Sequence, residues 1–143
     1  DFTYLNHPEK RATVERDGLI SVGDVGYLRD GHLYLCDRRS DMVISAGTNI
    51  YPAEIEMCLL QCPGVQDCAV FGIPDDRLGE DVAAVIVLRE GHALSQAELA
   101  EFLSASLAKH KIPAKVWFRE QPIPRNANGK FLKRELRKEL VGE

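Results

Sequence analysis

The sequence predicts an α+β fold in which a three-stranded sheet is packed by helices and preceded by a β-hairpin. Residues 82–88 read VAAVIVL, an apolar run that is typical of a central strand covered on both faces. Ser95 and Glu98 form a capping box in front of an apolar stripe, which predicts the start of a helix. The second part of the chain follows the order β-α-β-β-α-β-α without internal repeats. Helices at this spacing can all pack on one small sheet.

The first part of the chain is predicted to form a short helix and a hairpin. The helix spans about residues 8–15 and is followed by a turn at Asp17-Gly18. Residues 27–35 then read as two strands around an Asp30-Gly31 turn. These elements precede the sheet in the chain.

A boundary is predicted within residues 37–56, which read DRRSDMVISAGTNIYPAEIE. The charged run at 37–41 is too polar for a core, whereas residues 42–44 read as a short buried strand. Residues 45–47, Ser-Ala-Gly, form a corner of small residues where the backbone can approach a neighbour or a ligand closely. Taken alone, this stretch could equally be a surface turn between two elements.

The other elements follow from periodicity and from Gly and Pro positions. A helix is predicted from Pro52 to about Gln61, because proline suits the first helical position. The helix that begins at Ser95 should face the sheet with a stripe formed by Leu99, Phe102, Leu103 and Leu107. Strands are expected over residues 65–73, 81–88 and 115–118, a loop over 74–80, and a basic helix over 131–140.

Composition excludes several classes of function. The net charge of −4 and the scattered basic residues give no reason to expect a nucleic-acid partner. The four cysteines lack zinc-ligand spacing, and their apolar neighbours suggest small buried side chains in a reducing cytosol. No apolar run approaches the roughly 20 residues needed to span a membrane. We therefore expect a cytoplasmic protein with no metal site among its own residues.

Four segments, in order, resemble the adenylate-forming superfamily of acyl-CoA synthetases and their relatives. The junction at 37–56 is one of them. The others are DGLISVGDVGYLRDGHLYLCDR at 17–38, FGIPDDRLGE at 71–80 and PIPRNANGK at 122–130. The resemblance implies that residues 1–39 end a large N-terminal adenylation domain and that residues 40–143 form the mobile C-terminal domain. The chain is accordingly expected to be the tail of a longer protein.

The resemblance assigns nucleotide binding to Asp24 and Arg38, which the predicted hairpin presents at one end and at the other. An aspartate offers two acceptor oxygens to the two ribose hydroxyls, and a planar guanidinium suits ribose oxygens and phosphate. Ser40 falls at the hinge about which the domains of this superfamily rotate. The alternatives are an ordinary turn at Gly23-Asp24 and a solvated charge cluster at 37–41.

Lys130 matches the catalytic lysine of the superfamily. Its ammonium would lie between a carboxylate and the α-phosphate of ATP during formation of acyl-AMP. After domain rotation, Ser45, Ala46 and Gly47 would lie near coenzyme A, whose thiol accepts the acyl group. The alternative is that Lys130 is one of several lysines in a cationic C-terminal tail.

The resemblance implies ATP, coenzyme A and a carboxylic acid as substrates, with the chain's own N-terminal domain as partner. Mg²⁺ would be held mainly by that domain. Asn-Ile-Tyr-Pro at 49–52 is similar to fatty or aryl acid CoA ligases rather than to peptide-synthetase adenylation domains. A free-standing binding or regulatory module of the same fold is the alternative function.

Overall fold

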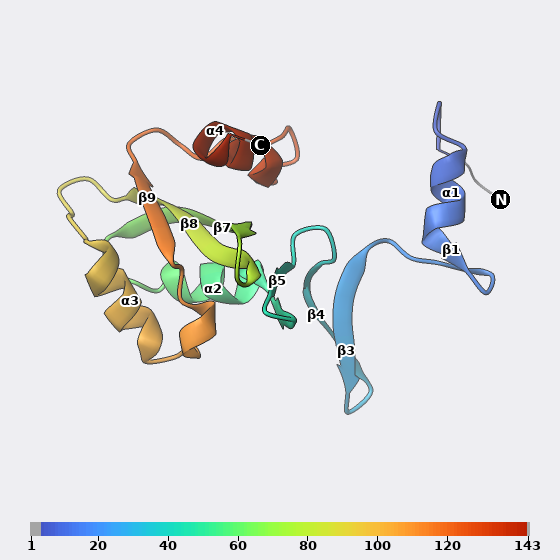
Figure 1. The fold of residues 1–143 in the computed structure, drawn as a ribbon, viewed down its shortest axis with the longest axis horizontal. Coiled ribbons are helices and arrows are strands. Elements are labelled where there is room, and N and C mark those ends of the chain that lie inside the picture. Colours follow the sequence, from blue (N-terminus) through green and yellow to red (C-terminus); the bar gives the residue numbers. More distant parts are fainter. Residues whose placement is uncertain (1–3, 143) are drawn as a thin grey trace. The chain divides into compact units, whose positions relative to one another are not determined.

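The computed structural model describes residues 4–142, which divide into two compact units (Figure 1). The first unit ends at Ser40 and the second begins at Asp41. The assignment of these units to two domains of a larger enzyme stays a prediction.

The first unit consists of a short helix and two small hairpins. Its elements are α1 (Glu9–Val14), β1 (Glu15–Arg16), β2 (Leu19–Ile20), β3 (Asp24–Arg29) and β4 (His32–Arg38). The predicted helix and both predicted turns are confirmed. Asp30 and Gly31 have φ values of 49° and 76°, which is the left-handed backbone that a two-residue hairpin turn requires.

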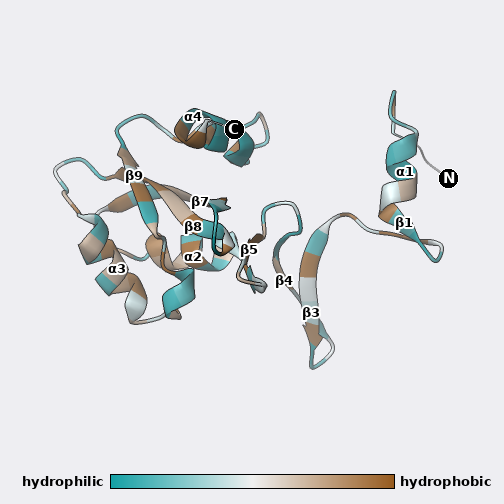
Figure 2. Cartoon of the chain, viewed as in Figure 1, coloured by the Kyte–Doolittle hydropathy of each residue, from teal (hydrophilic) through white to brown (hydrophobic). Residues whose placement is uncertain are grey.

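The first unit has no core of its own within residues 4–40, because none of them is buried. The hairpin of β3 and β4 presents large apolar side chains to solvent, and brown segments alternate along β3 in Figure 2. These exposed side chains include Leu28, Leu33 and Leu35. A two-stranded hairpin is marginally stable by itself, so this unit needs further protein surface to fold stably.

The second unit is a sheet with helices on both faces. Its elements are β5 (Val43–Ser45), β6 (Thr48–Ile50), α2 (Pro52–Leu59), β7 (Val65–Asp75), β8 (Gly79–Leu88), α3 (Gln96–Ser104), the 3₁₀ helix η1 (Lys109–Lys111), β9 (Lys115–Arg119) and α4 (Lys133–Val141). The strand order is β6-β5-β8-β7, and β9 also pairs with β8. The β8–β9 pairing is parallel, and the other pairings are antiparallel. The predicted α+β class is confirmed.

The predicted number of three strands was too low, because β5 and β6 extend the sheet to five strands. Each has three residues, and β5 pairs with β8 through the single residue pair Ser45↔Gly79. Such short strands leave no periodic signal in a sequence. The predicted buried strand at 42–44 was also partly wrong, since the Ile44 side chain is 49% exposed.

The predicted loop at 74–80 was too long. β7 and β8 continue to Asp75 and from Gly79, which leaves a turn of three residues. The carboxylate of Asp75 accepts hydrogen bonds from the backbone N–H groups of Arg77 and Leu78, at 2.9 and 2.8 Å. Pro74 is tolerated because β7 lies at the edge of the sheet.

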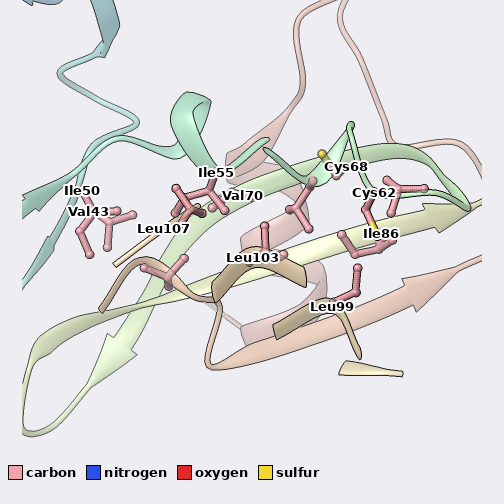
Figure 3. Close-up of a cluster of buried hydrophobic side chains, with 14 residues drawn as sticks. Val43, Ile50, Ile55, Cys62, Cys68, Val70, Ile86, Leu99, Leu103 and Leu107 are labelled. Carbon is pink, nitrogen blue, oxygen red and sulfur yellow. The ribbon is translucent and has the colours of Figure 1, made fainter. Parts of the chain in front are cut away.

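β8 is buried on both faces, as its continuous apolar run predicts. Val82, Ala84 and Ile86 belong to a cluster on the face covered by α2 and α3 (Figures 1 and 3). Ala83, Val85 and Val87 belong to a second cluster that includes Leu136 of α4. The alternation follows from the twofold period of a strand, and it places the two helical layers on opposite faces.

The helix α3 begins with the predicted capping box. The Ser95 hydroxyl accepts a hydrogen bond from the Glu98 N–H, and the Glu98 carboxylate accepts one from the Ser95 N–H. Leu99, Leu103 and Leu107 are buried, but Phe102 is 37% exposed and therefore lies at the margin of the predicted stripe.

Replacing Ile86 with Ala should lower the free energy of unfolding by about 2–5 kcal/mol, because a buried side chain leaves a cavity in the centre of the sheet. Urea denaturation measures the change. Ile44→Ala is the matched control, since this half-exposed side chain should contribute about 1 kcal/mol or less. Equal losses in both variants would contradict the central position of β8.

Replacing Ser95 with Ala should raise the pKa of Glu98 toward its ordinary value. Hydrogen bonds from the Ser95 hydroxyl and backbone N–H lower this pKa in the folded state, so the stabilisation they give exists above the unfolded-state pKa and is lost as the pH falls through the folded-state pKa. NMR titration of the Glu98 carboxyl carbon measures the shift. Ser104→Ala, on the same helix, should leave it unchanged.

Candidate functional site

Asp24 and Arg38 lie together at the open end of the β3–β4 hairpin. The expectation that they occupy different ends was wrong, because antiparallel pairing places the first residue of β3 opposite the last residue of β4. Arg38 Nε lies 3.5 Å from Asp24 Oδ1. A hollow of about 420 Å³ is lined by Arg38 and by its neighbours Val22, Gly23, Arg39 and Ser40, but not by Asp24.

This end of the hairpin combines a carboxylate with a guanidinium. The Arg38 and Asp24 side chains are 56% and 34% exposed, so solvent screens their ion pair and the pair contributes little to stability. The backbone around them is held separately, since the Arg39 N–H donates to the Gly23 carbonyl at 2.8 Å. A carboxylate that accepts from hydroxyls, beside a cation with several donors, suits a sugar that carries a phosphate. Ser40 is exposed and is the last residue of this unit.

Ser45, Ala46 and Gly47 form the tight turn between β5 and β6. Ser45 pairs with Thr48, and the two residues between them have φ values of 47° and 77°. Gly47 adopts this backbone freely, whereas positive φ costs energy at Ala46. The sequence predicted a corner of small residues here but not the positive φ at Ala46. The Ala46 N–H donates to the Leu78 carbonyl at 2.8 Å, which fixes the turn against the start of β8.

Glu80 is a functional candidate that the sequence did not reveal, since only a loop was predicted over residues 74–80. Its Oε2 accepts a hydrogen bond from the Ile44 N–H at 2.9 Å. Its Oε1 lies 3.5 Å from Nη1 of Arg137 on α4. No local signal could have revealed these partners, because they lie 36 and 57 residues away in the chain.

Lys130 lies in a closed loop before α4. Arg125 and Phe131 form a β-bridge that closes the loop, and the Asn126 N–H donates to the Lys130 carbonyl at 2.9 Å. The Asn126 side-chain oxygen accepts from the N–H groups of Asn128 and Lys130, at 3.0 and 2.9 Å. The helix was predicted to begin too early, since α4 starts at Lys133.

The ammonium group of Lys130 is exposed but has a partner. Its Nζ lies 3.3 Å from Oδ2 of Asp41, and the two side chains are 44% and 19% exposed. Asp41 is the first residue of the second unit. The lysine loop, residues 125–131, therefore lies beside the point where this unit begins. Asp41 was noted in the sequence only as part of a charge cluster.

The basic residues of α4 differ in their surroundings. Lys133 Nζ lies 2.7 Å from Oε1 of Glu56, and both side chains are mostly buried. The same oxygen accepts a hydrogen bond from the Val70 N–H at 2.8 Å. Lys133 therefore attaches α4 to α2 and β7, in contrast to the accessible ammonium of Lys130.

Comparison with known proteins identifies the family. Residues 54–130 match the family model of the AMP-binding enzyme C-terminal domain. The chain belongs to this family. The resemblance drawn from the four sequence segments is thereby confirmed.

Relatives of this AMP-binding enzyme C-terminal domain include named ligases. The chain is 44% identical over 137 residues to the long-chain-fatty-acid–CoA ligase FadD13 of Mycobacterium tuberculosis. This alignment covers 95% of the chain and 27% of the relative. The chain is also 45% identical over 141 residues to a 2-succinylbenzoate–CoA ligase of Bacillus cereus, in an alignment that covers 98% of the chain and 28% of that relative. The chain thus spans a little more than a quarter of the length of these relatives.

Solved structures agree with the family assignment. ATP-bound MatB from Rhodopseudomonas palustris has a TM-score of 0.87 and 36% identity over 99% of this chain and 29% of its own. The o-succinylbenzoate CoA synthetase of Bacillus subtilis, in complex with the acyl-adenylate intermediate OSB-AMP, has a TM-score of 0.85 and 41% identity over 94% of this chain and 27% of its own.

The cysteines of this AMP-binding family member are free thiols. Burial, followed by the charges of Glu56 and Asp67, raises the pKa of Cys68 to about 12, which keeps this thiol protonated. Within residues 4–142, no group of three or more His, Cys, Asp or Glu side chains could hold a metal ion. No helix in the same range has the length and apolar character needed to cross a membrane.

Replacing Lys133 with Ala should lower the free energy of unfolding of this AMP-binding family member by about 2 kcal/mol, because the mostly buried Glu56 carboxylate loses its cation. Urea denaturation measures the loss. Lys138→Ala removes an exposed lysine of the same helix and should change the free energy by about 0.5 kcal/mol or less. If the two losses are equal, Lys133 does not anchor α4.

Proposed function

We propose that this chain is the C-terminal part of an ATP-dependent, AMP-forming acyl-CoA ligase, which activates a carboxylic acid as acyl-AMP and transfers the acyl group to coenzyme A. The observation that carries the proposal is the placement of Lys130 in a closed loop with an accessible ammonium. The Lys130 side chain is 44% exposed although it pairs with Asp41, whereas Lys133 is mostly buried in its pair with Glu56. The names of the relatives support the same reaction class.

The first half-reaction joins two anions, and Lys130 would lower their repulsion. A carboxylate oxygen of the acid attacks the α-phosphorus of ATP, the bond to the β-phosphate oxygen breaks, and pyrophosphate leaves. A compact ammonium between the reactants stabilises the charge that develops on the phosphate oxygens. Asp24 would accept hydrogen bonds from the ribose hydroxyls, and Arg38 would contact ribose oxygens and phosphate.

The second half-reaction requires a different set of residues. The sulfur of coenzyme A attacks the acyl carbon, the bond to the phosphate oxygen breaks, and AMP leaves while the thiol gives up its proton. We assign the turn of Ser45, Ala46 and Gly47 to this step. Rotation about Ser40 would withdraw Lys130 and present the turn. As the hinge residue, Ser40 would absorb the change in φ and ψ that this rotation requires.

Residues 1–39 would belong to the end of the N-terminal adenylation domain, and residues 40–143 would form the mobile C-terminal domain. The absence of any buried residue in the described part of the first unit supports this, because its apolar side chains need a larger body to cover them. That body is the partner we propose. Mg²⁺ would be held mainly by that body and would shield the phosphates of ATP, and the roles given above do not depend on it.

The substrate class we propose is a fatty or aryl acid. Relatives named for long-chain fatty acids and for 2-succinylbenzoate are about equally similar to this chain, at 44% and 45% identity. Their names support the class without narrowing it to one acid. A cytoplasmic location is part of the proposal, because ATP and coenzyme A are cytosolic substrates and the four cysteines are free thiols.

Replacing Lys130 with Ala in the full-length enzyme should lower ATP–pyrophosphate exchange by about two to three orders of magnitude, the effect of losing one preorganised charge contact. Exchange is measured across a panel of fatty and aromatic acids, so that the wild-type enzyme also identifies its substrate.

Lys138→Ala is the control for this experiment, because it removes an exposed lysine of α4 and should leave exchange unchanged. Equal exchange in wild type and Lys130→Ala would remove the catalytic role of Lys130. No exchange with any acid would favour the free-standing binding or regulatory module.

A further inference from the structure

Glu80 connects the start of β8 to the strand that leads into the Ser45–Gly47 turn. Its Oε2 accepts a hydrogen bond from the Ile44 N–H at 2.9 Å, although Ile44 lies 36 residues away in the chain. Ile44 immediately precedes the turn. A hydrogen bond from a backbone N–H to a carboxylate is roughly twice as strong as one between neutral groups, so this contact restrains β5 directly beside the turn.

Few other bonds hold this strand to β8. The β5–β8 ladder contains the single pair Ser45↔Gly79, and the Ala46 N–H donates to the Leu78 carbonyl at 2.8 Å. The turn also contains a residue with unfavourable backbone, Ala46 at φ 47°. A strained backbone conformation persists only where neighbouring contacts hold it in place. The hydrogen bond from the Ile44 N–H to the Glu80 carboxylate is one of these contacts.

The space around the carboxylate is shaped for it. Gly72 of β7 lies opposite, and a Cβ atom at this position would stand 2.9 Å from Glu80 Oε1 and 3.2 Å from Cγ1 of Val43. Any larger residue at position 72 would therefore have to displace the carboxylate or the strand β5. In the strand register, Gly72 pairs with Val82 and Pro74 pairs with Glu80. Gly72 is therefore the diagonal neighbour of Glu80, two residues away on the same face of the sheet.

The same carboxylate faces the helix that follows the lysine loop. Nη1 of Arg137 lies 3.5 Å from Glu80 Oε1, and Arg137 belongs to α4, which begins three residues after Lys130. Both side chains are about two-thirds buried. Glu80 thus contacts both the strand that leads into the Ser45–Gly47 turn and the helix α4.

We propose that Glu80 is a positioning residue for the thioester-forming half-reaction, in which it holds the Ser45–Gly47 turn in the geometry that admits the thiol of coenzyme A. The inference rests on the proposed function. Glu80 acts through the Ile44 N–H and does not itself contact the reacting atoms. The adenylation half-reaction depends on Lys130 and does not require this turn.

The test separates the two half-reactions in the full-length enzyme. Adenylation is followed by ATP–pyrophosphate exchange, and thioester formation by single-turnover reaction of preformed acyl-AMP with coenzyme A. Glu80→Ala should slow thioester formation about tenfold, the size expected for losing a hydrogen bond to a charged group, and should leave exchange within about twofold. Glu80→Gln should retain most of the thioester rate, because its amide oxygen still accepts from the Ile44 N–H.

Two further variants complete the design. Glu120→Ala removes an exposed carboxylate beyond the end of β9 and should alter neither rate. Gly72→Ala displaces the Glu80 carboxylate without removing it and should also slow thioester formation selectively, so it decides the matter if Glu80→Ala does not fold. Parallel loss of both half-reactions would show that Glu80 only maintains the fold, and unchanged rates in Glu80→Ala would equally overturn the proposal.

Amide hydrogen exchange in the full-length protein gives a readout that is independent of activity. Exchange at Ile44 and Ala46 should accelerate in Glu80→Ala and remain slow in Glu80→Gln. If the wild-type enzyme activates no acid, the proposed function is wrong, and exchange at these two amides then decides separately whether Glu80 holds the turn. Unchanged exchange in Glu80→Ala would overturn the positioning role.

Discussion

The burial of β8 on both faces is the constraint on which the second unit depends. Its side chains alternate between a cluster with α2 and α3 and a cluster with α4, so one strand sets the position of both helical layers. The start of the same strand carries Glu80 and contacts the Ser45–Gly47 turn. The core and the candidate site are therefore parts of one arrangement, because the strand that organises packing also fixes the turn.

Charged residues of the family segments serve mainly to join elements. Glu56 of α2 pairs with Lys133, and Glu80 of β8 pairs with Arg137, so two carboxylates attach α4 to the rest of the unit. The lysine loop is closed by hydrogen bonds to Asn126. The bonds to Asn126 restrict the backbone that carries Lys130, whose side chain stays 44% exposed.

Periodic and locally capped elements could be predicted from the sequence. The apolar run of β8 and the capping box at Ser95 are complete within a few residues, so their outcome did not depend on distant contacts. A strand at 42–44 and a corner at 45–47 could be predicted, but the pairing of β5 with β6 and β8 could not, because each of the two short strands has three residues and β5 joins the sheet through contacts to β8. Glu80 was missed for the same reason, since a side chain's distant partner leaves no trace in local spacing.

The apolar run of β8 also carries a risk during synthesis. A segment of this kind, with high β-propensity and neither charge nor proline, readily forms intermolecular sheets when it is exposed. In the folded unit, β7 covers one edge of β8, while β9 and β5 cover the other. Because β9 leaves the ribosome after β8 and α3, that edge is open for part of translation. The parallel neighbour β9 is therefore what closes the last open edge of this apolar strand.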